Sequence, residues 1–547
     1  MQSILEVVLA RFVVFRRETD LYKKDFQNLG ELLEDRAKKF ARKPFLIFGR
    51  RKFTFSEINN LSSYLASFLN KEGVGFQDRV CIWMSNLPWF VISYFAILKI
   101  GAIAVPVNSM FKREEAKFLV EDTQAKVLIV APENIEPAFN IKLRVNSLSK
   151  IISFSFNKDV YQEVIDLRDI LNGKEEFFKR VTVKPQDIAE ILYTSGTTGE
   201  PKGACLTHRN LLANIRDCQI AISASSEDVF SCFLPLFHSF ASTVCLLFPL
   251  YTGSTTVLFR SIRPFKRVLK GIFKNRVSVF VGVPSIFSAL KEVKLPLIFR
   301  IPLLKKFFNP LRVAISGASA LACEVIPAFE KKFGIPLLEG YGLTEASPVV
   351  SLSPLKGKRK PGSIGKVFPS QEVKVVDSQG KELPVGEVGE LIVKGPNVMK
   401  GYFKRVEDTQ KTIRGGWLYT GDLAKIDEEG FIYIVGRIKE MINVRGLNVY
   451  PREIEEVIYQ LSPVKECAVV GINHPRKGEV PLVFIAFKEG ESLSSQEIFN
   501  YLKDRLAVYK LPWRIEVRES LPKSSTGKIV KYLLKEEAES KFFKKAD

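Results

Sequence analysis

The run IAEILYTSGTTGEPKG, residues 188–203, joins an apolar, strand-like segment to a loop rich in glycine and hydroxyl groups. Gly196 and Gly199 allow positive φ and close backbone approach, so successive N–H groups can form a concave nest for anionic oxygens. The common phosphate-loop pattern needs Gly before its lysine and Ser or Thr after it, whereas Pro201 and Gly203 occupy those places here. Side chains of the run that can add hydroxyl or ammonium contacts are Thr194, Ser195, Thr197, Thr198 and Lys202. We therefore predict a phosphate-binding loop, with a solvated turn as the alternative.

Apolar strand-like segments alternate with helical patterns on both sides of this loop. The helical patterns include residues 55–69 and 89–100, and the strand-like segments are residues 79–84, 125–131, 188–194, 255–259, 277–283 and 311–316. Such alternation is typical of parallel sheets covered by helices. Sheets of this kind bind ligands at the carboxyl ends of their strands. Two of the strand-like segments, residues 188–194 and 311–316, run directly into glycine loops at those ends. The sequence therefore predicts an α/β fold with its site at those strand ends.

Shorter patterns fill the last third of the chain. Three strand-like segments separated by Gly and Asp turns follow Gly365, namely residues 371–377, 389–395 and 430–436. Two further strand-like segments, residues 466–472 and 481–487, lie between helical patterns at residues 451–461 and 494–506. The second helical pattern opens on a Ser–x–x–Glu cap. We expect a small β-rich subdomain followed by a small α+β domain.

Composition narrows the class of protein. The 547 residues exceed what one compact core usually holds, and the seven cysteines are scattered without a CxxC pair, which argues against a disulfide framework or a zinc site and fits a reducing cytosol. The net charge of +21 attracts polyanions, which include nucleic acid, anionic lipid and phosphorylated substrates. Because no zinc-finger spacing, RNP-like aromatic motif or basic heptad array accompanies this charge, nucleic acid is not an expected partner.

The amino-terminal residues 4–15 are strongly apolar but short. Glu6 and Arg11 interrupt them, and a bilayer span needs about 20 apolar residues. The stretch also lacks the basic start and the small-residue cleavage site of a signal peptide. It is either a helix packed on the body of the protein or an interfacial membrane helix. We expect a cytoplasmic protein, with a peripheral position on the inner face of the cell membrane as the alternative.

Six further motifs follow or flank the loop in a fixed order. They are LPLFHSF (residues 234–240), SGASAL (316–321), EGYGLTEASP (339–348), YTGDLA (419–424), GRIKEMINVRGLNVYPREIE (436–455) and PKSSTGKIVK (522–531). Over roughly residues 28–535 the chain resembles the AMP-forming adenylate-forming enzymes, which include acyl-CoA synthetases, coumarate ligases, luciferases and peptide-synthetase adenylation domains. The amino-acid sequences of the motifs are most similar to those of long-chain fatty acyl-CoA synthetases.

The resemblance implies a domain plan. It is a large N-terminal domain of two helix-covered, mostly parallel sheets plus a small β-barrel-like subdomain, followed by a small mobile α+β C-terminal domain. The boundaries we expect are an extension at 1–25, an ATP- and acyl-binding domain at 26–436 with its β-rich part at about 365–436, a hinge at 437–440, a lid domain at 441–535 and a charged tail at 536–547. The hinge residue is Lys439. Whether the chain forms a dimer is not readable from the sequence.

The resemblance also implies a two-step reaction with ATP, Mg²⁺ and coenzyme A. A carboxylate attacks the α-phosphate of ATP to give acyl-AMP and pyrophosphate, and a thiol then displaces AMP. Lys528 would bridge the carboxylate and the α-phosphate, and Thr344 would contact the same phosphate. Glu345, together with Thr198, would hold Mg²⁺, which prefers carboxylate and phosphate oxygens. Without the motifs, Lys528 would be one exposed lysine among many.

The remaining implied residues surround the nucleotide and the acyl group. Those at the nucleotide are Gly196, Gly199, Ala318, Ser319, Glu339, Gly340, Tyr341, Gly342, Asp422 and Arg437, with Tyr341 stacking on adenine and Asp422 accepting from the ribose hydroxyls. Those at the acyl pocket are Phe237, His238, Phe240 and Val283. Arg445 and Gly446 would pass the pantetheine arm of coenzyme A, although relatives often carry Ser or Lys where Arg445 stands. Alternatively, Tyr341 and His238 pack in the core, and Asp422 and Arg437 form surface ion pairs.

The substrate is expected to be a medium- or long-chain fatty acid. The stretch near residues 231–242 holds no acidic residue, unlike amino-acid adenylation domains, and is rich in phenylalanine. Residues 260–312 carry thirteen Lys or Arg but one acid, Glu292, and they include the apolar run 295–308. Basic side chains interleaved with apolar ones suit an anionic membrane surface, with a solvated basic face as the alternative. Rival functions are an acyl-carrier-protein or aryl-CoA ligase and a membrane-associated binder of acyl groups and nucleotides that has lost catalysis.

Overall fold

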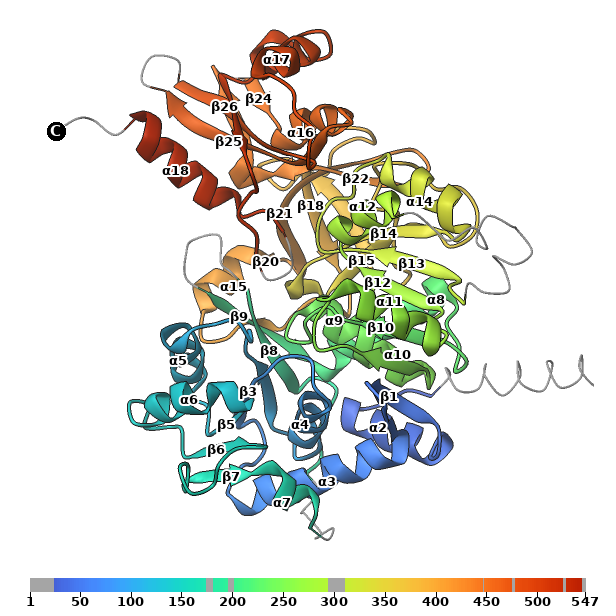
Figure 1. Cartoon of the computed structure of the whole chain (residues 1–547), viewed down its shortest axis with the longest axis vertical. Coiled ribbons are helices and arrows are strands. Elements are labelled where there is room, and N and C mark those ends of the chain that lie inside the picture. Colours follow the sequence, from blue (N-terminus) through green and yellow to red (C-terminus); the bar gives the residue numbers. More distant parts are fainter. Residues whose placement is uncertain are drawn as a thin grey trace, which may run out of the picture.

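Two large sheets build most of the molecule in the computed structural model, which describes residues 24–173, 181–194, 201–293, 310–445, 447–474, 478–524 and 528–543 (Figure 1). The nine-stranded sheet has the order β16 (Lys366–Val367), β15 (Val349–Leu352), β14 (Leu337–Gly342), β13 (Val313–Ser316), β12 (Val279–Gly282), β10 (Val229–Cys232), β11 (Thr255–Leu258), β1 (Pro44–Phe48) and β2 (Arg51–Thr54). The eight-stranded sheet has the order β19 (Gly401–Tyr402), β9 (Lys202–Thr207), β8 (Ile188–Thr194), β4 (Ile103–Pro106), β3 (Arg79–Trp83), β5 (Val127–Val130), β6 (Lys150–Ser153) and β7 (Val164–Asp166).

The prediction of mostly parallel sheets is confirmed, with antiparallel strands added at the edges. In the nine-stranded sheet, β10, β11, β12, β13 and β14 pair in parallel, while β15, β16 and β2 pair antiparallel. In the eight-stranded sheet, β9 and β19 form an antiparallel edge next to β8. The parallel strands therefore bring several carboxyl ends to one edge of the nine-stranded sheet.

Helices cover both sheets. The helices that pack in the shared core are α2 (Leu29–Lys39), α3 (Phe55–Lys71), α4 (Pro88–Lys99), α8 (His208–Ile222) and α10 (Phe248–Thr252). Side chains of α7 (Leu167–Leu171), α11 (Phe265–Lys274), α12 (Pro284–Glu292) and α14 (Val325–Phe333) join them in this core, whereas α5 (Arg113–Thr123) and α6 (Ile135–Lys142) cover a second apolar cluster. Almost every residue of α4 is buried, as expected for a helix that is apolar on all sides.

The alternation of side chains along β3 separates two cores. Val80 and Ile82 point into a large apolar cluster that also contains residues of α4, α10 and β12. Cys81 and Trp83 point into a second cluster, which lies under α5 and α6. This period of two is the pattern that a strand buried on both faces must show.

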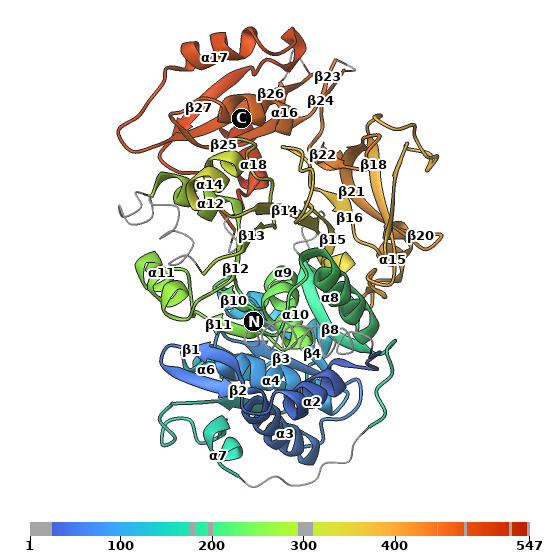
Figure 2. The same cartoon turned by 90° about the vertical axis from the view of Figure 1, so that its right-hand side faces the viewer.

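The β-rich segment and the carboxyl-terminal segment form their own sheets. The first has β17 (Glu372–Val376), β18 (Gly389–Lys394), β20 (Ile413–Arg414), β21 (Trp417–Ile426) and β22 (Ile432–Arg437), with α15 (Val406–Thr412) beside it. The second, at the top of Figure 2, has β23 (Ile442–Val444), β24 (Leu447–Val449), α16 (Pro451–Tyr459), β25 (Val464–His474), β26 (Gly478–Phe487), α17 (Ser495–Lys503), β27 (Arg514–Arg518) and α18 (Lys531–Phe543). Ser494 and Glu497 form the reciprocal capping box expected for α17.

Several predicted features lie outside the described residues. They are Ser195, Gly196, Thr197, Thr198 and Gly199 of the phosphate loop, Gly446, the run 295–308, and residues 1–23 of the extension. Within the ranges given above, none of the helices is both long enough and apolar enough to cross a bilayer.

Candidate active site

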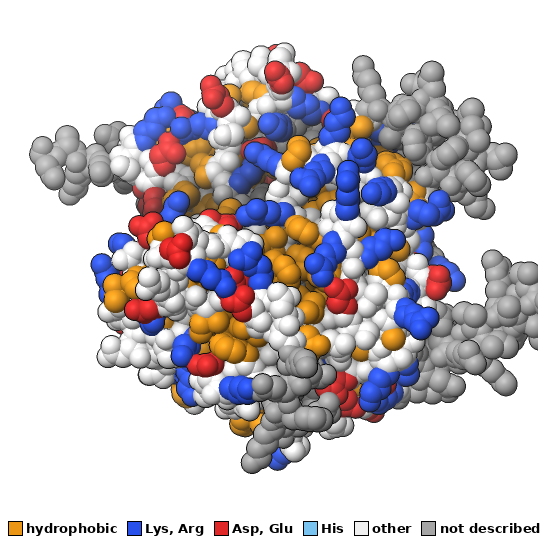
Figure 3. Space-filling view, turned by 60° about the horizontal axis from the view of Figure 1, so that its bottom comes forward, with side chains coloured by type: hydrophobic (Ala, Val, Ile, Leu, Met, Phe, Trp, Pro, Cys, Tyr) orange, Lys and Arg blue, Asp and Glu red, His pale blue; other side chains and the backbone are white. Residues whose placement is uncertain are grey.

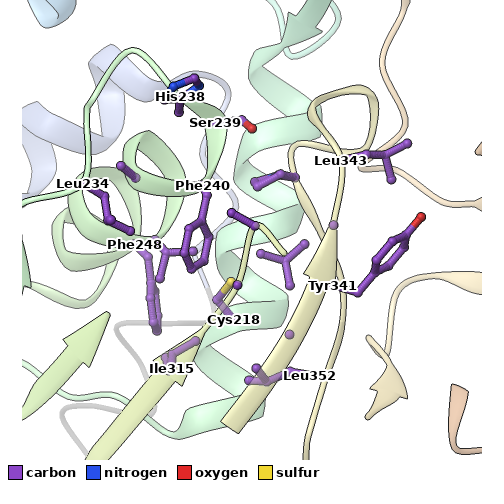
Figure 4. Close-up of a pocket in the computed structure, with 18 of the residues that line it drawn as sticks. Cys218, Leu234, His238, Ser239, Phe240, Phe248, Ile315, Tyr341, Leu343 and Leu352 are labelled. Carbon is purple, nitrogen blue, oxygen red and sulfur yellow. The ribbon is translucent and has the colours of Figure 1, made fainter. Parts of the chain in front are cut away.

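An apolar cavity of about 230 Å³ lies where β10, β12, β13 and β14 end (Figure 4). Residues at or just beyond these ends line it, including Leu234, Val283, Ile315 and Gly340. Among the labelled residues of Figure 4, His238 and Ser239 lie at one end and Cys218 and Leu352 at the other. The lining contains no Asp, Glu, Lys or Arg side chain among the described residues. The expected site at the strand ends is therefore present, and its interior suits an apolar group.

The predicted acyl-pocket residues fall into two groups. His238, Phe240 and Val283 line the cavity. Phe237 does not line it, and its ring instead packs against the imidazole of His238 with the ring centroids 4.5 Å apart. Burial lowers the pKa of His238 to about 4, so its imidazole is neutral at neutral pH. A π-helical turn, Ser242–Leu247, follows this segment and contributes Val244 to the lining, in keeping with the frequent occurrence of such turns at functional sites.

Gly342 and Gly317 occupy positions without room for a side chain. A Cβ on Gly342 would lie 2.1 Å from the carbonyl oxygen of Pro348, and one on Gly317 would lie 2.8 Å from the Phe240 ring. Ala318, the next residue, has φ of +73° and lines the cavity with Gly340, Tyr341 and Gly342. Close backbone approach thus forms this wall, as the glycine-rich motifs predict. Ser319 is not part of the lining.

Glu339 is a buried carboxylate within β14. It is 1% exposed, and its Oε1 accepts a hydrogen bond of 3.0 Å from the backbone N–H of Leu321. Its Oε2 has no hydrogen-bond partner among the described residues, and burial raises its pKa to about 7. A buried acceptor without a partner suits a ligand donor, which is consistent with the predicted place of Glu339 at the nucleotide.

Asp422 joins two of the predicted nucleotide residues. The antiparallel pairing of β21 and β22 places Asp422 opposite Arg437, whose Nε donates to Asp422 Oδ1 at 2.8 Å. The hydroxyl of Tyr341 donates to Asp422 Oδ2 at 2.5 Å, and burial together with this carboxylate raises the pKa of Tyr341 far above its ordinary value. Each oxygen keeps a second lone pair for a ribose hydroxyl. Tyr341 is therefore tethered through its hydroxyl, which the sequence did not predict.

Lys528 comes to this Asp422–Arg437 pair from the carboxyl-terminal sheet. The backbone N–H of Ser524 donates to the Lys528 carbonyl at 2.8 Å, which forms the base of the predicted turn. Glu466 anchors the segment before this turn by accepting from the Lys523 ammonium at 2.5 Å and from the Leu521 N–H at 3.1 Å. The Lys528 side chain is solvent-accessible, yet the surrounding protein and the charge of Arg437 lower its pKa, while Glu440 and Asp422 act in the opposite direction.

Glu345, Thr344 and Lys202 form a polar corner beside the cavity. The hydroxyl of Thr344 lies 3.3 Å from that of Ser239, and the hydroxyl of Tyr402 donates to Glu345 Oε1 at 2.8 Å. The Lys202 ammonium lies 2.6 Å from Asp408 Oδ1. Sequence reasoning missed both Tyr402 and Asp408.

The donor set around Glu345 fits a hard cation that takes most of its ligands from phosphates and water. No cluster of three or more His, Cys, Asp or Glu side chains suited to a metal occurs within the described ranges. Glu345 therefore offers one carboxylate, steadied by Tyr402, and Mg²⁺ commonly binds through one or two carboxylates plus substrate phosphates.

The predicted hinge and acceptor residues lie at the start of the carboxyl-terminal segment. Lys439 sits in a short 3₁₀ turn, Ile438–Glu440, directly after β22, and its side chain is exposed. Lys531 bridges Glu440 at 3.1 Å and Glu455 at 2.8 Å. Arg445 has φ of +53° and turns the chain between β23 and β24.

Comparison with known proteins gives full-length matches. A long-chain-fatty-acid–CoA ligase of Bacillus subtilis (strain 168) is 35% identical over 547 residues, with 95% of this chain and 96% of that protein covered. A feruloyl-CoA synthase of Amycolatopsis sp is 31% identical, with 92% and 98% covered. ATP-bound MatB from Rhodopseudomonas palustris is 28% identical and has a TM-score of 0.85, with 94% of this chain and all of that chain covered.

Two family models match in the order of the structural parts. The model described as "AMP-binding enzyme" matches residues 33–403, and the model described as "AMP-binding enzyme C-terminal domain" matches residues 453–528. The first covers both large sheets, and the second covers the three-stranded sheet of β25, β26 and β27 and ends on Lys528. The apolar cavity and Tyr341 lie within the first of these parts and Lys528 is the last residue of the second, and the chain belongs to the AMP-binding enzyme family.

Proposed function

We propose that this protein joins ATP and a medium- or long-chain fatty acid to give acyl-AMP and pyrophosphate, and then transfers the acyl group to coenzyme A. The observation that carries the proposal is the cavity, whose described lining residues include Thr344 and carry no charged side chain. The name of the Bacillus subtilis relative supports a fatty acid, whereas that of the Amycolatopsis relative supports an aromatic acid. An aryl-CoA ligase is therefore the second candidate.

The charges around the cavity suit the adenylation step. A carboxylate must approach a polyanion, so cations and fixed donors at the α-phosphate lower the barrier. Lys528 would contact the carboxylate and the α-phosphate, and Thr344 would donate to the same phosphate. Lys202 and the phosphate loop would hold the leaving pyrophosphate, with Asp422 at the ribose. Mg²⁺, held by Glu345 and Thr198, would neutralise charge on the phosphates.

The test is pyrophosphate release with ATP, Mg²⁺ and acids from acetate to oleate, together with benzoate and ferulate, with and without coenzyme A. We expect release that peaks with medium or long chains and turnover that requires coenzyme A. A peak with aromatic acids would favour the second candidate. If pyrophosphate is released and the acyl group is transferred to an acyl carrier protein but not to coenzyme A, the thiol acceptor is the carrier protein. No release with any acid would refute the proposal.

The size of the cavity leads to a prediction about chain length. At about 30 Å³ for each methylene, similar to the volume of one water in the liquid, the 230 Å³ holds about eight carbons. Cys218 is buried at the end away from His238, and Cys218→Phe should fill that end. We expect kcat/KM for octanoate to fall about tenfold or more while that for butanoate changes little.

The matched control is Cys218→Ala, which removes volume at the same place. This variant should leave the chain-length preference for the acid unchanged or move it toward longer acids. Because overpacking costs about 1–3 kcal/mol, Tm is measured for both variants. If Cys218→Phe lowered kcat/KM equally for all acids, this would contradict the placement of the acyl terminus beside residue 218.

We also propose that helix α11 docks on an anionic membrane surface, such as the inner face of the cell membrane. Val268 and Ile272 face inward, while Phe273 is 43% exposed at the edge of the helix. Six exposed cations on or next to α11 have no acidic partner among the described residues: Arg263, Lys266, Arg267, Lys270, Lys274 and Arg276. Lys and Arg side chains gather on the face drawn in Figure 3, with exposed apolar side chains between them. Cations at the headgroups and an aromatic ring at the boundary suit such a surface.

Vesicle flotation tests this surface. We expect binding to vesicles that contain phosphatidylglycerol but not to neutral phosphatidylcholine vesicles. Replacing Lys266, Arg267 and Lys270 with glutamine should weaken binding by about tenfold or more, because each cation near such a surface contributes ~1 kcal/mol. A triple variant at exposed lysines elsewhere, Lys52, Lys381 and Lys503, is the control and should bind normally. Equal binding by both variants would refute the role of α11.

A further inference from the structure

The lysine that ends the phosphate loop is held by a carboxylate that no sequence motif predicted. Lys202 is the first residue of β9, and its ammonium lies 2.6 Å from Oδ1 of Asp408 on α15. The Lys202 side chain is 16% exposed and that of Asp408 is 31% exposed, so the pair is partly shielded from water. Asp408 is the acidic partner of Lys202 among the described residues.

The position of Asp408 is fixed by the strand that precedes it. β19 pairs with β9, so that Tyr402 lies opposite Ala204, and the N–H of Phe403 donates to the Gly203 carbonyl at 2.7 Å. The hydroxyl of Thr409, next to Asp408, accepts from the Tyr402 N–H at 2.9 Å. Backbone and side-chain bonds together therefore hold α15 beside the end of the phosphate loop.

The same segment reaches the expected metal ligand. The Tyr402 hydroxyl donates to Glu345 Oε1 at 2.8 Å, and the Lys202 ammonium lies 5.7 Å from the centre of the Tyr402 ring. Lys202, Tyr402 and Glu345 thus share one corner of the site, on the side where the leaving phosphates of the proposed reaction would lie. Asp408 lies beside this corner and forms an ion pair with the Lys202 ammonium.

The charges around Asp408 keep it ionised. The hydrogen bond from Lys202 holds the pKa of the Asp408 carboxyl below its ordinary value, and the charges of Lys202, Lys411 and Arg405 add to this effect against the cost of burial. At neutral pH the Lys202–Asp408 pair therefore carries almost no net charge. A paired ammonium attracts an approaching anion less than a free one does.

We propose that Asp408 is a positioning residue that competes with phosphate oxygens for the Lys202 ammonium and so limits how tightly the site holds pyrophosphate. An ammonium has three donors, so it can contact a phosphate while Asp408 stays at its back, or it can move from one acceptor to the other. In both cases the carboxylate weakens the hold on the polyanion. Tight binding of pyrophosphate would slow its release and favour the reverse reaction, so the carboxylate favours forward turnover.

The inference rests on the proposed contact of Lys202 with the leaving phosphates, and its test does not depend on the acid. Calorimetric titration of the full-length protein with magnesium pyrophosphate measures the dissociation constant directly. For Asp408→Asn, which keeps the shape but removes the charge, we expect a dissociation constant about three- to tenfold lower than that of the unmodified protein. Asp408→Glu should restore a value near the original.

A neighbouring carboxylate provides the matched control. Glu407 precedes Asp408 in the same helix, and its side chain is 89% exposed and reaches Lys411 at 3.9 Å. Glu407→Gln removes the same charge one residue away and should leave pyrophosphate binding unchanged. In turnover assays with a substrate acid, Asp408→Asn should lower the inhibition constant of pyrophosphate and the KM for ATP together, with a smaller change in kcat.

The outcomes separate the two proposals. If Asp408→Asn binds pyrophosphate no more tightly than Glu407→Gln does, or binds it more weakly with a lowered Tm, then Asp408 only supports the local structure and the inference is overturned. If the unmodified protein activates no acid yet Asp408→Asn tightens pyrophosphate binding, the proposed reaction fails while the role of Asp408 stands.

Discussion

Lys528→Ala should slow acyl-AMP formation by about 10²- to 10³-fold, because in the proposed reaction the variant lacks the cation that would stabilise charge developing at the α-phosphate. The thioester step from synthetic acyl-AMP should stay close to normal, since no charge builds on phosphorus there in the same way. Single-turnover pyrophosphate release measures the first step, and thioester formation from acyl-AMP measures the second. The charges of Asp422 and Arg437 both act on the pKa of Lys528, so this ammonium lies near the pair that we propose holds the nucleotide.

Two variants sharpen this test. Lys535→Ala removes a partly exposed lysine of α18 that pairs with Glu539 at 4.0 Å and should leave both steps unchanged. Lys528→Arg keeps the charge and should recover part of the rate. Equal losses in both half-reactions for Lys528→Ala would contradict a role confined to adenylation.

The pH dependence follows from the lowered pKa of Lys528. The amine acts as a cation, so the rate of adenylation should fall as pH rises through this pKa, at a pH below that expected for an ordinary lysine. Because a guanidinium stays protonated, Lys528→Arg should move this alkaline limb to higher pH or abolish it. An alkaline limb that is the same in both proteins would assign it to another group.

The short-range features of this fold could be predicted from the sequence. The apolar run 188–194 coincides with β8, and the helical pattern 89–100 is shifted by one residue from α4, Pro88–Lys99. In each case consecutive residues are mostly apolar, as is typical of a strand or helix that is covered on all sides, although the strand also buries Glu190. The cap at Ser494 and Glu497 is equally local.

Long-range pairing is what the sequence could not supply. Asp408 meets Lys202 only because β19 pairs with β9, and these strands lie almost two hundred residues apart in a register that no periodicity encodes. Tyr341 could be identified from its motif, yet its hydroxyl bond to Asp422 depends on the placement of β21. Phe237 and Phe240 look alike in sequence, but a backbone turn sends only Phe240 into the cavity.

Lys439→Pro should slow the thioester step by about tenfold or more and change acyl-AMP formation much less. Proline fixes φ near −65°, which lies in the range of a 3₁₀ turn such as the one that holds Lys439 here. The substitution should therefore favour the arrangement in which Lys528 reaches the Asp422–Arg437 pair. The proposed second step needs the opposite face of the small domain, with Arg445, and so requires this segment to change its dihedral angles.

Separate measurement of the half-reactions decides whether the hinge acts in this way. Lys439→Ala removes the same side chain without restricting φ and should leave both steps near normal, which isolates the backbone effect. Lys531 bridges Glu440 and Glu455, which both follow residue 439, so this bridge should persist in both variants and keep the small domain folded. A loss shared equally by the two half-reactions in Lys439→Pro would mean that proline distorts the adenylation arrangement itself. A selective loss of the thioester step would mean that rotation at residue 439 carries the protein from one reaction to the other.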